Sequence, residues 1–491
     1  MVVARLDDEL AHLRALVDAG GLVDGDGLLG VELELHLVDE HGRPSWSNDT
    51  LLAALAEHDV DLQTELARFN VELNLPPVPL AGDGRTGGDG AGPLATVRTA
   101  IGRAIGAASS AVAGIGAVSV GTLPTLGPAD VTAAAMSDRG RYQQLDASIM
   151  RARGGEIALD IDGRDAGGER LTATLDTILL EAAATSLQVH LDLPADGFAA
   201  AWNAAQAVAA VQVAVAANAP VLLGRTLWHE TRVPLFEQLI DVRSAAQRDP
   251  TSAVALPPRV WFGGRWIEHP ADLFAENLTL FRQPLVDDDG AADGTVGDLA
   301  ALLRHNGTVW RWNRPVYAAN AGRPTLRIEN RVLSAPPTAA DAAADVALFV
   351  GLVTGLAADV DALTDRLPFA DADANFRAAA RHGLAAELRW PGVRGTATAG
   401  ELLADRLIEV AADGLATAGV PADEAGAALD VIAGRASEGR NGAAWQLAAL
   451  AEEEVHHDRT TALERMLLRY RDLQAAGEPV HRWPWPGTRT A

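Results

Sequence analysis

Four short segments of this chain alternate between apolar residues and residues with carboxylate, amide, imidazole or guanidinium side chains, with one exception, Asn330, at an apolar position. Side chains of a β-strand point alternately to opposite faces of a sheet, so each segment is expected to form a strand with one apolar and one polar face. The segments are residues 30–37, 69–75, 187–193 and 326–332, and their polar positions are Glu32, Glu34 and His36; Asn70, Glu72 and Asn74; Gln188, His190 and Asp192; and Arg327, Glu329 and Arg331. The pattern predicts an antiparallel sheet.

This polar face has two interpretations. A face exposed to solvent is the common one, but solvated strands usually carry residues of high β-propensity such as Thr rather than carboxylates. Neighbouring like charges such as Glu32 and Glu34 destabilise a strand face unless opposite charge offsets them. Divalent cations with oxygen ligands supply that charge, and the two arginines that flank Glu329 suit a polyphosphate. Agreement among the four segments favours an acidic funnel floor that binds Mg²⁺ and a nucleoside triphosphate.

The 491-residue chain contains no lysine and no cysteine. A P-loop, a kinase-type site and a pyridoxal enzyme each require a lysine, whereas disulfides, Cys nucleophiles and Cys zinc sites require a cysteine. Phosphate binding must therefore rely on arginine, backbone N–H groups or metal ions. The formal charge of −26 argues against a nucleic-acid partner and against an anionic membrane surface.

Alanine makes up much of the 48% hydrophobic content, which favours helices. The most apolar stretch, 198–223, is interrupted by Asn and Gln and predicts a buried helix rather than a membrane span. A helix is also predicted at 172–184. From Thr338 onward the chain is expected to be almost wholly helical, with Thr338 and Asp341 capping the first helix.

The chain is expected to divide into two parts. Residues 1–370 would form a catalytic α+β core, and residues 371–491 a helical C-terminal subdomain packed on that core. No basic segment followed by an apolar one opens the sequence, so no signal peptide is predicted and the expected location is the cytoplasm.

Eight longer runs are spread along nearly the whole chain: GVELELHLVDEHGRP (30–44), QTELARFNVELNLPP (63–77), TSLQVHLDL (185–193), LWHETRVPLFEQ (227–238), HNGTVWRWNRPVY (305–317), LRIENRVLSAPPT (326–338), GRNGAAWQ (439–446) and RYRDLQAAGEPVHRWP (469–484). Together they resemble the bacterial glutamate–cysteine ligase family, and most closely its actinobacterial branch of carboxylate–amine ligases. The most specific motifs are the paired Glu32 and Glu34, the glutamates 65 and 72 seven residues apart, and the Glu329/Arg331 pair.

The resemblance implies an α+β fold of the glutamine-synthetase type, in which an antiparallel sheet curves into a funnel with helices outside. It implies catalytic roles for Glu329 and Arg331, with Arg331 meeting the ATP phosphates, and makes Arg232 a candidate for the substrate carboxylate. Gln188, Asn74, Arg68 and Arg327 are further candidates for binding ATP or substrate. The metal ligands implied are Glu32, Glu34, Glu65, Glu72, His190 and Glu329.

The activity implied is ATP-dependent amide formation through an acyl phosphate. L-Glutamate and L-cysteine would give γ-glutamylcysteine, ADP and phosphate, a reaction of thiol biosynthesis such as that of glutathione. Two or three Mg²⁺ ions, with Mn²⁺ as a substitute, would serve as cofactors, and a homodimer is an expectation drawn from the family. Two alternatives stay open: a ligase of the same family that uses another amine or amino acid, and a homologue that binds a nucleotide or metabolite without turnover.

A few other features are weighed against plainer explanations. His36 shares a strand face with Glu32 and Glu34, but a structural role is the more common one. Trp310 and Trp312 fit either the core or a shelf for a nucleobase, with the core favoured. The Gly/Asp-rich segment 81–92 is expected to be surface loop rather than a lid.

Overall fold

The computed structural model describes residues 2–22, 27–81, 91–281, 298–320 and 323–487. Within these residues, the largest sheet has seven strands in the order β12–β13–β7–β1–β3–β2, with β4 also paired to β1, and every pair is antiparallel. Its strands are β1 (Leu28–Val38), β2 (Leu62–Thr64), β3 (Asn70–Pro79), β4 (Gly116–Val118), β7 (Ser186–Asp192), β12 (Asn313–Asn320) and β13 (Arg323–Ser334). The α+β class and the antiparallel sheet predicted from the sequence are confirmed, and the sheet does not close into a barrel.

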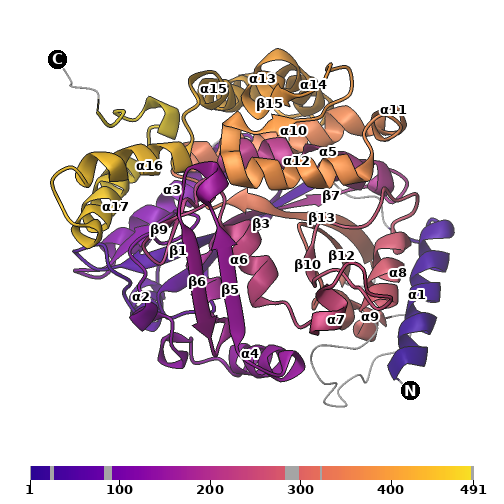
Figure 1. The fold of residues 1–491 in the computed structure, drawn as a ribbon. Helices are drawn as coiled ribbons and strands as arrows, with labels where there is room; N and C mark the ends of the chain where they lie inside the picture. Colours follow the sequence, from indigo (N-terminus) through magenta and orange to yellow (C-terminus); the bar gives the residue numbers. More distant parts are fainter. Residues whose placement is uncertain (1, 23–26, 82–90, 282–297, 321–322, 488–491) are drawn as a thin grey trace.

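One face of this sheet is covered by long helices. The apolar positions of the alternating segments are buried there, with Leu33, Val189 and Ile328 each fully buried. The covering helices are α3 (Pro93–Ser110), α5 (Phe198–Ala216) and α10 (Ala339–Ala357) (Figure 1). Alternation thus directs the apolar residues to the helices and leaves the polar residues on the opposite face.

Helices α5 and α10 are long and apolar enough to cross a membrane by composition alone, but most of each is buried inside the protein. Both pack against the sheet and against each other, which is the behaviour of core helices. The prediction that the apolar stretch 198–223 contains a buried helix is therefore confirmed; the helix ends at Ala216, and Val221–Leu222 form strand β8. Thr338 also caps α10 as predicted, because its Oγ1 accepts a hydrogen bond from the N–H of Asp341.

The remaining elements surround this centre. The other helices are α1 (Val2–Asp18), α2 (Asn48–Leu55), α4 (Gly140–Arg153), α6 (Arg232–Leu239), α7 (Ala245–Arg248), α8 (Ala271–Leu280), α9 (Ala300–Asn306), α11 (Val360–Thr364), α12 (Phe369–His382), α13 (Ala399–Leu402), α14 (Ile408–Thr417), α15 (Ala422–Glu438), α16 (Gly442–Glu453) and α17 (Arg459–Ala476). Short strands form four two-stranded sheets: β5 (Ile157–Asp162) with β6 (Arg170–Leu175), β8 (Val221–Leu222) with β9 (Arg225–Thr226), β10 (Val260–Trp261) with β11 (Trp310–Arg311), and β14 (Glu387–Leu388) with β15 (Ala397–Thr398).

The helix predicted at 172–184 is wrong. Residues 170–175 form strand β6, and a short 3₁₀-helix follows at Ile178–Ala183. Thr172 and Thr174 are β-branched and alternate with apolar neighbours, and pairing with β5 holds residues 170–175 extended. This correction matters because the 3₁₀-helix leads directly into β7 at the edge of the polar face.

The C-terminal helices pack closely on the sheet-bearing part. Arg435 of α15 forms ion pairs with Asp341 and Asp345 of α10, at 2.8 and 2.6 Å, and all three side chains are buried. The hydrophobic core is continuous across residue 370, so the division into 1–370 and 371–491 stays a prediction about the chain's organisation. The segment 81–92 lies mostly outside the described residues.

Candidate active site

Antiparallel pairing brings polar positions of separate strands into rows across the uncovered face of the sheet. Glu329 of β13 is opposite Arg314 of β12 on one side and His190 of β7 on the other. Glu32 of β1 is opposite Gln188 of β7. Directly opposed residues have Cβ atoms about 4.5–5.5 Å apart, so side chains that are distant in sequence can act on one ligand.

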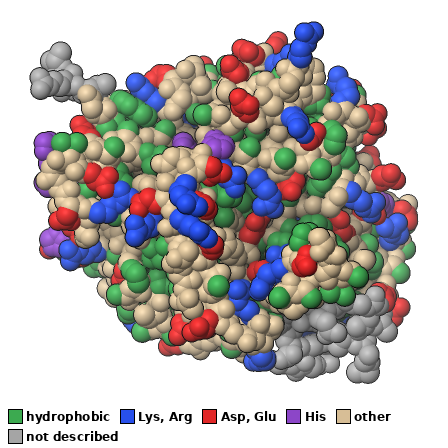
Figure 2. Space-filling model, in the orientation of Figure 1, with side chains coloured by type: hydrophobic (Ala, Val, Ile, Leu, Met, Phe, Trp, Pro, Cys, Tyr) green, Lys and Arg blue, Asp and Glu red, His purple; other side chains and the backbone are tan. Residues whose placement is uncertain are grey.

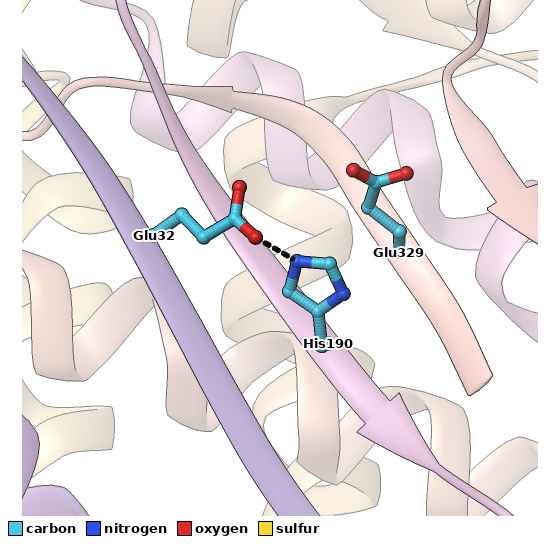
Figure 3. A group of neighbouring side chains, drawn as sticks. All are labelled: Glu32, His190 and Glu329. Atoms are coloured by element: carbon cyan, nitrogen blue, oxygen red, sulfur yellow. Dashed lines mark ion pairs between the residues drawn. The ribbon is translucent and has the colours of Figure 1, made fainter. Parts of the chain in front are cut away.

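Glu32, His190 and Glu329 converge at the centre of this face (Figure 3). His190 Nε2 lies 2.9 Å from Glu32 Oε1, and one potential ligand atom from each of the three residues lies within 4.8 Å of the others. On the other side of the ring, Arg327 Nε donates a hydrogen bond to His190 Nδ1. Because Nδ1 accepts this hydrogen bond, the proton of the neutral imidazole lies on Nε2, which faces Glu32. Nε2 would bind a metal ion only after this proton is released.

Deeper along the same face, three further carboxylates lie close enough to repel one another. Burial, together with the charge of Glu72, raises the pKa of Glu34 to about 7. Burial also raises the pKa of Glu72, and burial with the charges of Glu34 and Glu72 raises that of Glu65 well above its usual value. The backbone N–H of Ser186 donates to Glu34 at 2.7 Å, but this does not offset the loss of solvation. Glu34, Glu65 and Glu72 therefore have too little positive charge around them to offset their burial and mutual repulsion.

Glu329 has the opposite electrostatic environment. Burial alone would raise its pKa, but Arg314 and Arg331 outweigh burial and lower the pKa to about 2. Arg314 pairs with both carboxylate oxygens of Glu329, and Arg331 Nη1 donates to Glu329 Oε1 at 2.8 Å and to Gln188 Oε1 at 2.6 Å. The guanidinium of Arg331 is thus held in place at the pocket surface.

These side chains line a pocket with a volume of about 450 Å³. Among the residues predicted from the sequence, the lining includes Glu32, Glu34, Glu65, Glu72, Gln188, His190, Arg327, Glu329 and Arg331. The structure therefore brings together all of the residues that the family resemblance implied as metal ligands. It also places Arg331 beside them.

Three predicted binding residues lie outside the lining. Arg232 is buried behind β13, where its guanidinium donates to Glu230 and to the main-chain carbonyls of Arg331 and Val332. Asn74 Nδ2 donates to Glu72 Oε1 at 2.8 Å, so it supports a lining residue. Arg68 has an exposed side chain.

His36 also lies outside the lining and is fully buried, between Asn70 and Thr185. Burial lowers its pKa to about 3, so it stays neutral. The structural role that the sequence favoured for His36 agrees with this placement. Trp312 is likewise in the core, whereas Trp310 lines the pocket.

Several lining residues were missed by sequence reasoning. Arg314 had a usable signal, because a hairpin between β12 and β13 places it opposite Glu329. Arg141 and Tyr142 on α4 and Glu181 on the 3₁₀-helix had none, because no strand alternation marks them. Only the packing of α4 and the 3₁₀-helix at the edge of the sheet reveals these three side chains.

Part of the pocket is apolar. Phe236 packs edge-on against Trp310, with ring centroids 6.1 Å apart. The apolar lining residues are Leu66, Leu145, Ile178, Phe236, Ile240, Trp310 and Val316, contributed largely by elements that border the sheet rather than by the sheet itself. The pocket thus offers charged groups on its floor and apolar contacts on its wall.

The chemistry of the site fits divalent cations and a polyphosphate. Carboxylate oxygens with one imidazole nitrogen form a ligand set that Mg²⁺ or Mn²⁺ accepts, and the carboxylates with raised pKa values gain a counter-charge from such ions. Arg141 and Arg327 also line the pocket, and no carboxylate of the described chain pairs with either. On the face shown in Figure 2, acidic and basic side chains are interspersed.

Comparison with known proteins agrees with this chemistry. The model of glutamate–cysteine ligase family 2 matches residues 28–465. A glutamate–cysteine ligase from Mycolicibacterium smegmatis, EgtA, is 31% identical over 242 residues, which are 47% of this chain and 48% of that protein. The matched region thus spans about half the length of this curated relative.

A solved structure shares the fold. The glutamate–cysteine ligase of Francisella tularensis, determined in complex with AMP, superimposes with a TM-score of 0.55 at 13% sequence identity. The match covers 95% of this chain and 91% of that one.

Proposed function

This chain belongs to glutamate–cysteine ligase family 2, and from that premise we propose that it is an ATP-dependent carboxylate–amine ligase. The donor carboxylate is that of L-glutamate, and the first candidate for the acceptor is L-cysteine, because both relatives compared above bear the name glutamate–cysteine ligase. The observation that carries the proposal is the convergence of Glu32, His190 and Glu329 beside Arg331 in one pocket.

The reaction has two steps. An oxygen of the donor carboxylate attacks the γ-phosphorus of ATP, and ADP leaves, which produces an acyl phosphate. The nitrogen of the amine then attacks the acyl carbon, phosphate departs with one former carboxylate oxygen, and a proton is lost from nitrogen. Phosphoryl transfer of this kind depends on positioning and charge neutralisation more than on covalent help from the protein.

The chain's own residues supply both requirements. Glu32, Glu34, Glu65, Glu72, His190 and Glu329 would hold the metal ions. When bound, Mg²⁺ neutralises phosphate charge and aligns the phosphates with the donor carboxylate. Arg331, fixed between Glu329 and Gln188, offers its guanidinium to the phosphates, and Arg327 orients His190.

Arg232 has a supporting role in this proposal. Its guanidinium binds the main-chain carbonyl of Arg331 from behind the strand, at 3.2 Å, and its charge partly opposes the rise in the pKa of Glu34 that burial and Glu72 cause. It would thus position Arg331 and favour ionised Glu34 rather than contact the substrate carboxylate. We further propose a cytoplasmic enzyme of thiol biosynthesis that can form a homodimer.

A panel assay tests the activity. Purified protein is incubated with ATP, Mg²⁺, L-glutamate and, in turn, L-cysteine, other amino acids and simple amines, and both ADP and product mass are measured. Release of ADP that requires Mg²⁺, glutamate and an amine supports the ligase. No ADP above background with any acceptor, in protein shown to be folded, would refute it and favour a binding protein without turnover.

The variant Glu329→Gln tests the site. We expect kcat to fall by about 100-fold or more, because one charge is lost where charge stabilisation acts on the transition state. Gln Oε1 can still accept from Arg314 Nη2 and Arg331 Nη1, but its amide NH2 replaces the oxygen that accepts from Arg314 Nε, so the variant should stay folded with a lower melting temperature. Glu169→Gln, a half-buried carboxylate outside the pocket lining that also pairs with two arginines, Arg225 and Arg459, is the matched control. Wild-type kcat in Glu329→Gln would remove Glu329 from the site.

A further inference from the structure

Glu181 lies in the pocket but belongs to none of the motifs that point to metal or ATP. It is on the 3₁₀-helix Ile178–Ala183, which immediately precedes strand β7. In a 3₁₀-helix, residues three apart project from the same side. Ile178 and Glu181 accordingly both line the pocket, whereas Leu179 and Leu180 are buried in the core. Local geometry therefore presents one carboxylate and one apolar side chain together.

Glu181 differs from every other carboxylate of the pocket in having no partner. Glu32 pairs with His190, and Glu329 pairs with two arginines. Glu34, Glu65 and Glu72 accept hydrogen bonds from Ser186, Leu66 and Asn74, respectively. Within the described chain, no hydrogen bond or ion pair involves the carboxylate of Glu181. Glu181 is half-buried and lines the open pocket, so a cationic ligand group in the pocket can reach its carboxylate.

The nearby arginines are engaged elsewhere. Burial and the charge of Glu34 raise the pKa of Glu181 to about 7, although Arg331 and Arg232 act in the opposite direction. Arg331 donates to Glu329 and Gln188, and Arg232 donates to Glu230 and main-chain carbonyls. Neither guanidinium bonds to Glu181. A cationic ligand group bound in the pocket would supply a counter-charge that these arginines do not.

The apolar wall adds a second requirement. Ile178 adjoins Glu181 on the same face of the 3₁₀-helix, and α6, which carries Phe236, packs against this helix. The wall offers nothing to a phosphate, while Arg331 and the candidate metal ligands occupy the sheet floor. A ligand that fits between Glu181 and the apolar side chains of Ile178 and Phe236 carries a cationic group for the carboxylate and an uncharged group for the apolar wall.

We propose that Glu181 binds the ammonium group of the acceptor amine, with Ile178 and Phe236 contacting the uncharged part of that molecule. This inference rests on the proposed ligase function and extends it to the second substrate. Glu181 then sets the preference for acceptors that carry a primary amine, and the apolar wall contacts a small uncharged side chain such as that of L-cysteine.

The test separates donor activation from acceptor binding. Wild type, Glu181→Gln and the control Glu169→Gln are assayed with ATP, Mg²⁺ and L-glutamate, using either L-cysteine or hydroxylamine as acceptor. Hydroxylamine is mostly neutral at pH 7 and traps the acyl phosphate as a hydroxamate, with release of phosphate. KM is measured for each substrate, together with the Mg²⁺ concentration for half-maximal rate and the melting temperature.

For Glu181→Gln we expect KM for the amino-acid acceptor to rise at least tenfold. KM for glutamate and ATP, the Mg²⁺ requirement and the rate with hydroxylamine should stay within twofold of wild type. If no amino acid serves as acceptor for the wild type, the amine that gives most product in the panel replaces L-cysteine.

Three results would overturn the inference. An unchanged acceptor KM removes Glu181 from the acceptor site. A raised glutamate KM instead moves Glu181 to the donor's ammonium group, and a raised Mg²⁺ requirement makes Glu181 a metal ligand. Failure of the wild type to form hydroxamate counts against the ligase function itself, so the two failures are distinguishable.

Discussion

At the residue scale, the same side chain acquires opposite properties at neighbouring positions. Glu34 and Glu329 both project from one sheet face, yet the pKa of the first is raised to about 7 and that of the second is lowered to about 2. Both are buried, which raises the pKa of each. The difference comes from partners, because Glu34 faces Glu72 whereas Glu329 is paired with Arg314 and Arg331.

The raised pKa of Glu34 predicts pH-dependent metal binding. The folded, metal-free protein holds a proton on Glu34 up to about pH 7, whereas an unfolded chain releases it near the ordinary value of 4.5. Stability contributed by this proton is therefore present below about pH 4.5 and is lost as pH rises towards 7. Metal binding requires the ionised form, so Mg²⁺ affinity should rise as pH increases through about 7.

Calorimetry in buffers of different ionisation enthalpy measures this effect. Proton release on Mg²⁺ binding should be substantial near pH 6.5 and should decline above pH 8. The variant Glu34→Gln should bind Mg²⁺ more weakly and release fewer protons. Proton release that does not change between pH 6.5 and 8.5 would contradict the assignment of Glu34 as a ligand.

At the element scale, close approach of strands depends on Gly30. This residue of β1 is directly opposite His190 of β7, and a Cβ at Gly30 would lie 3.2 Å from the Cβ of His190. Gly30→Ala should therefore push the imidazole away from Glu32 by a few tenths of an ångström. We expect a higher Mg²⁺ requirement, by about tenfold as for loss of an outer-shell partner, with nearly unchanged melting temperature. An unchanged Mg²⁺ requirement would show that His190 does not bind metal.

Two helices also meet through glycine. Gly414 of α14 packs against Gly351 of α10 so closely that a Cβ would overlap the carbonyl oxygen of Gly351. Backbone atoms cannot rotate away, so Gly414→Ala should destabilise the fold by about 3 kcal/mol. Chemical denaturation measures the change. Gly106→Ala on α3, where a Cβ meets nothing within 4 Å, is the matched control and should be neutral or slightly stabilising.

At the scale of the whole molecule, a buried charge cluster ties the C-terminal helices to the rest. Arg435 pairs with Asp341 and Asp345, and Asp341 also accepts from the backbone N–H of Val480. Arg435→Met leaves two buried carboxylates without their cation and should cost about 3–5 kcal/mol of unfolding free energy.

Two further variants sharpen this prediction. Arg465→Met removes an exposed ion pair with Glu453 and should cost at most about 1 kcal/mol. Adding Asp341→Asn and Asp345→Asn to Arg435→Met should recover part of the lost stability, because the unpaired charge is gone. Equal losses for Arg435→Met and Arg465→Met, measured by urea denaturation, would show that the cluster does not hold the parts together.

The sequence predicted more of the sheet than of its surroundings. The strands at 30–37, 69–75, 187–193 and 326–332 were read correctly because alternation is a local property of a strand. The helix predicted at 172–184 was wrong because pairing between β5 and β6 is a tertiary interaction that local propensity does not contain. Sequence reasoning found the residues of the pocket floor because strand alternation marks them locally. It missed the 3₁₀-helix because the position of that helix depends on tertiary packing.

The sequence by itself determined which residue types handle phosphate and which side chains share the polar face. A chain without lysine or cysteine can bind phosphate only through arginine, backbone N–H groups and metal ions. The two-residue repeat of a β-strand places the polar side chains on one face of the sheet. The tertiary structure alone decided that Arg141 and Glu181 join the pocket and that Arg232 turns behind β13. It also decided the directions of the pKa shifts, because burial and charge proximity depend on segments that meet only after the chain has packed.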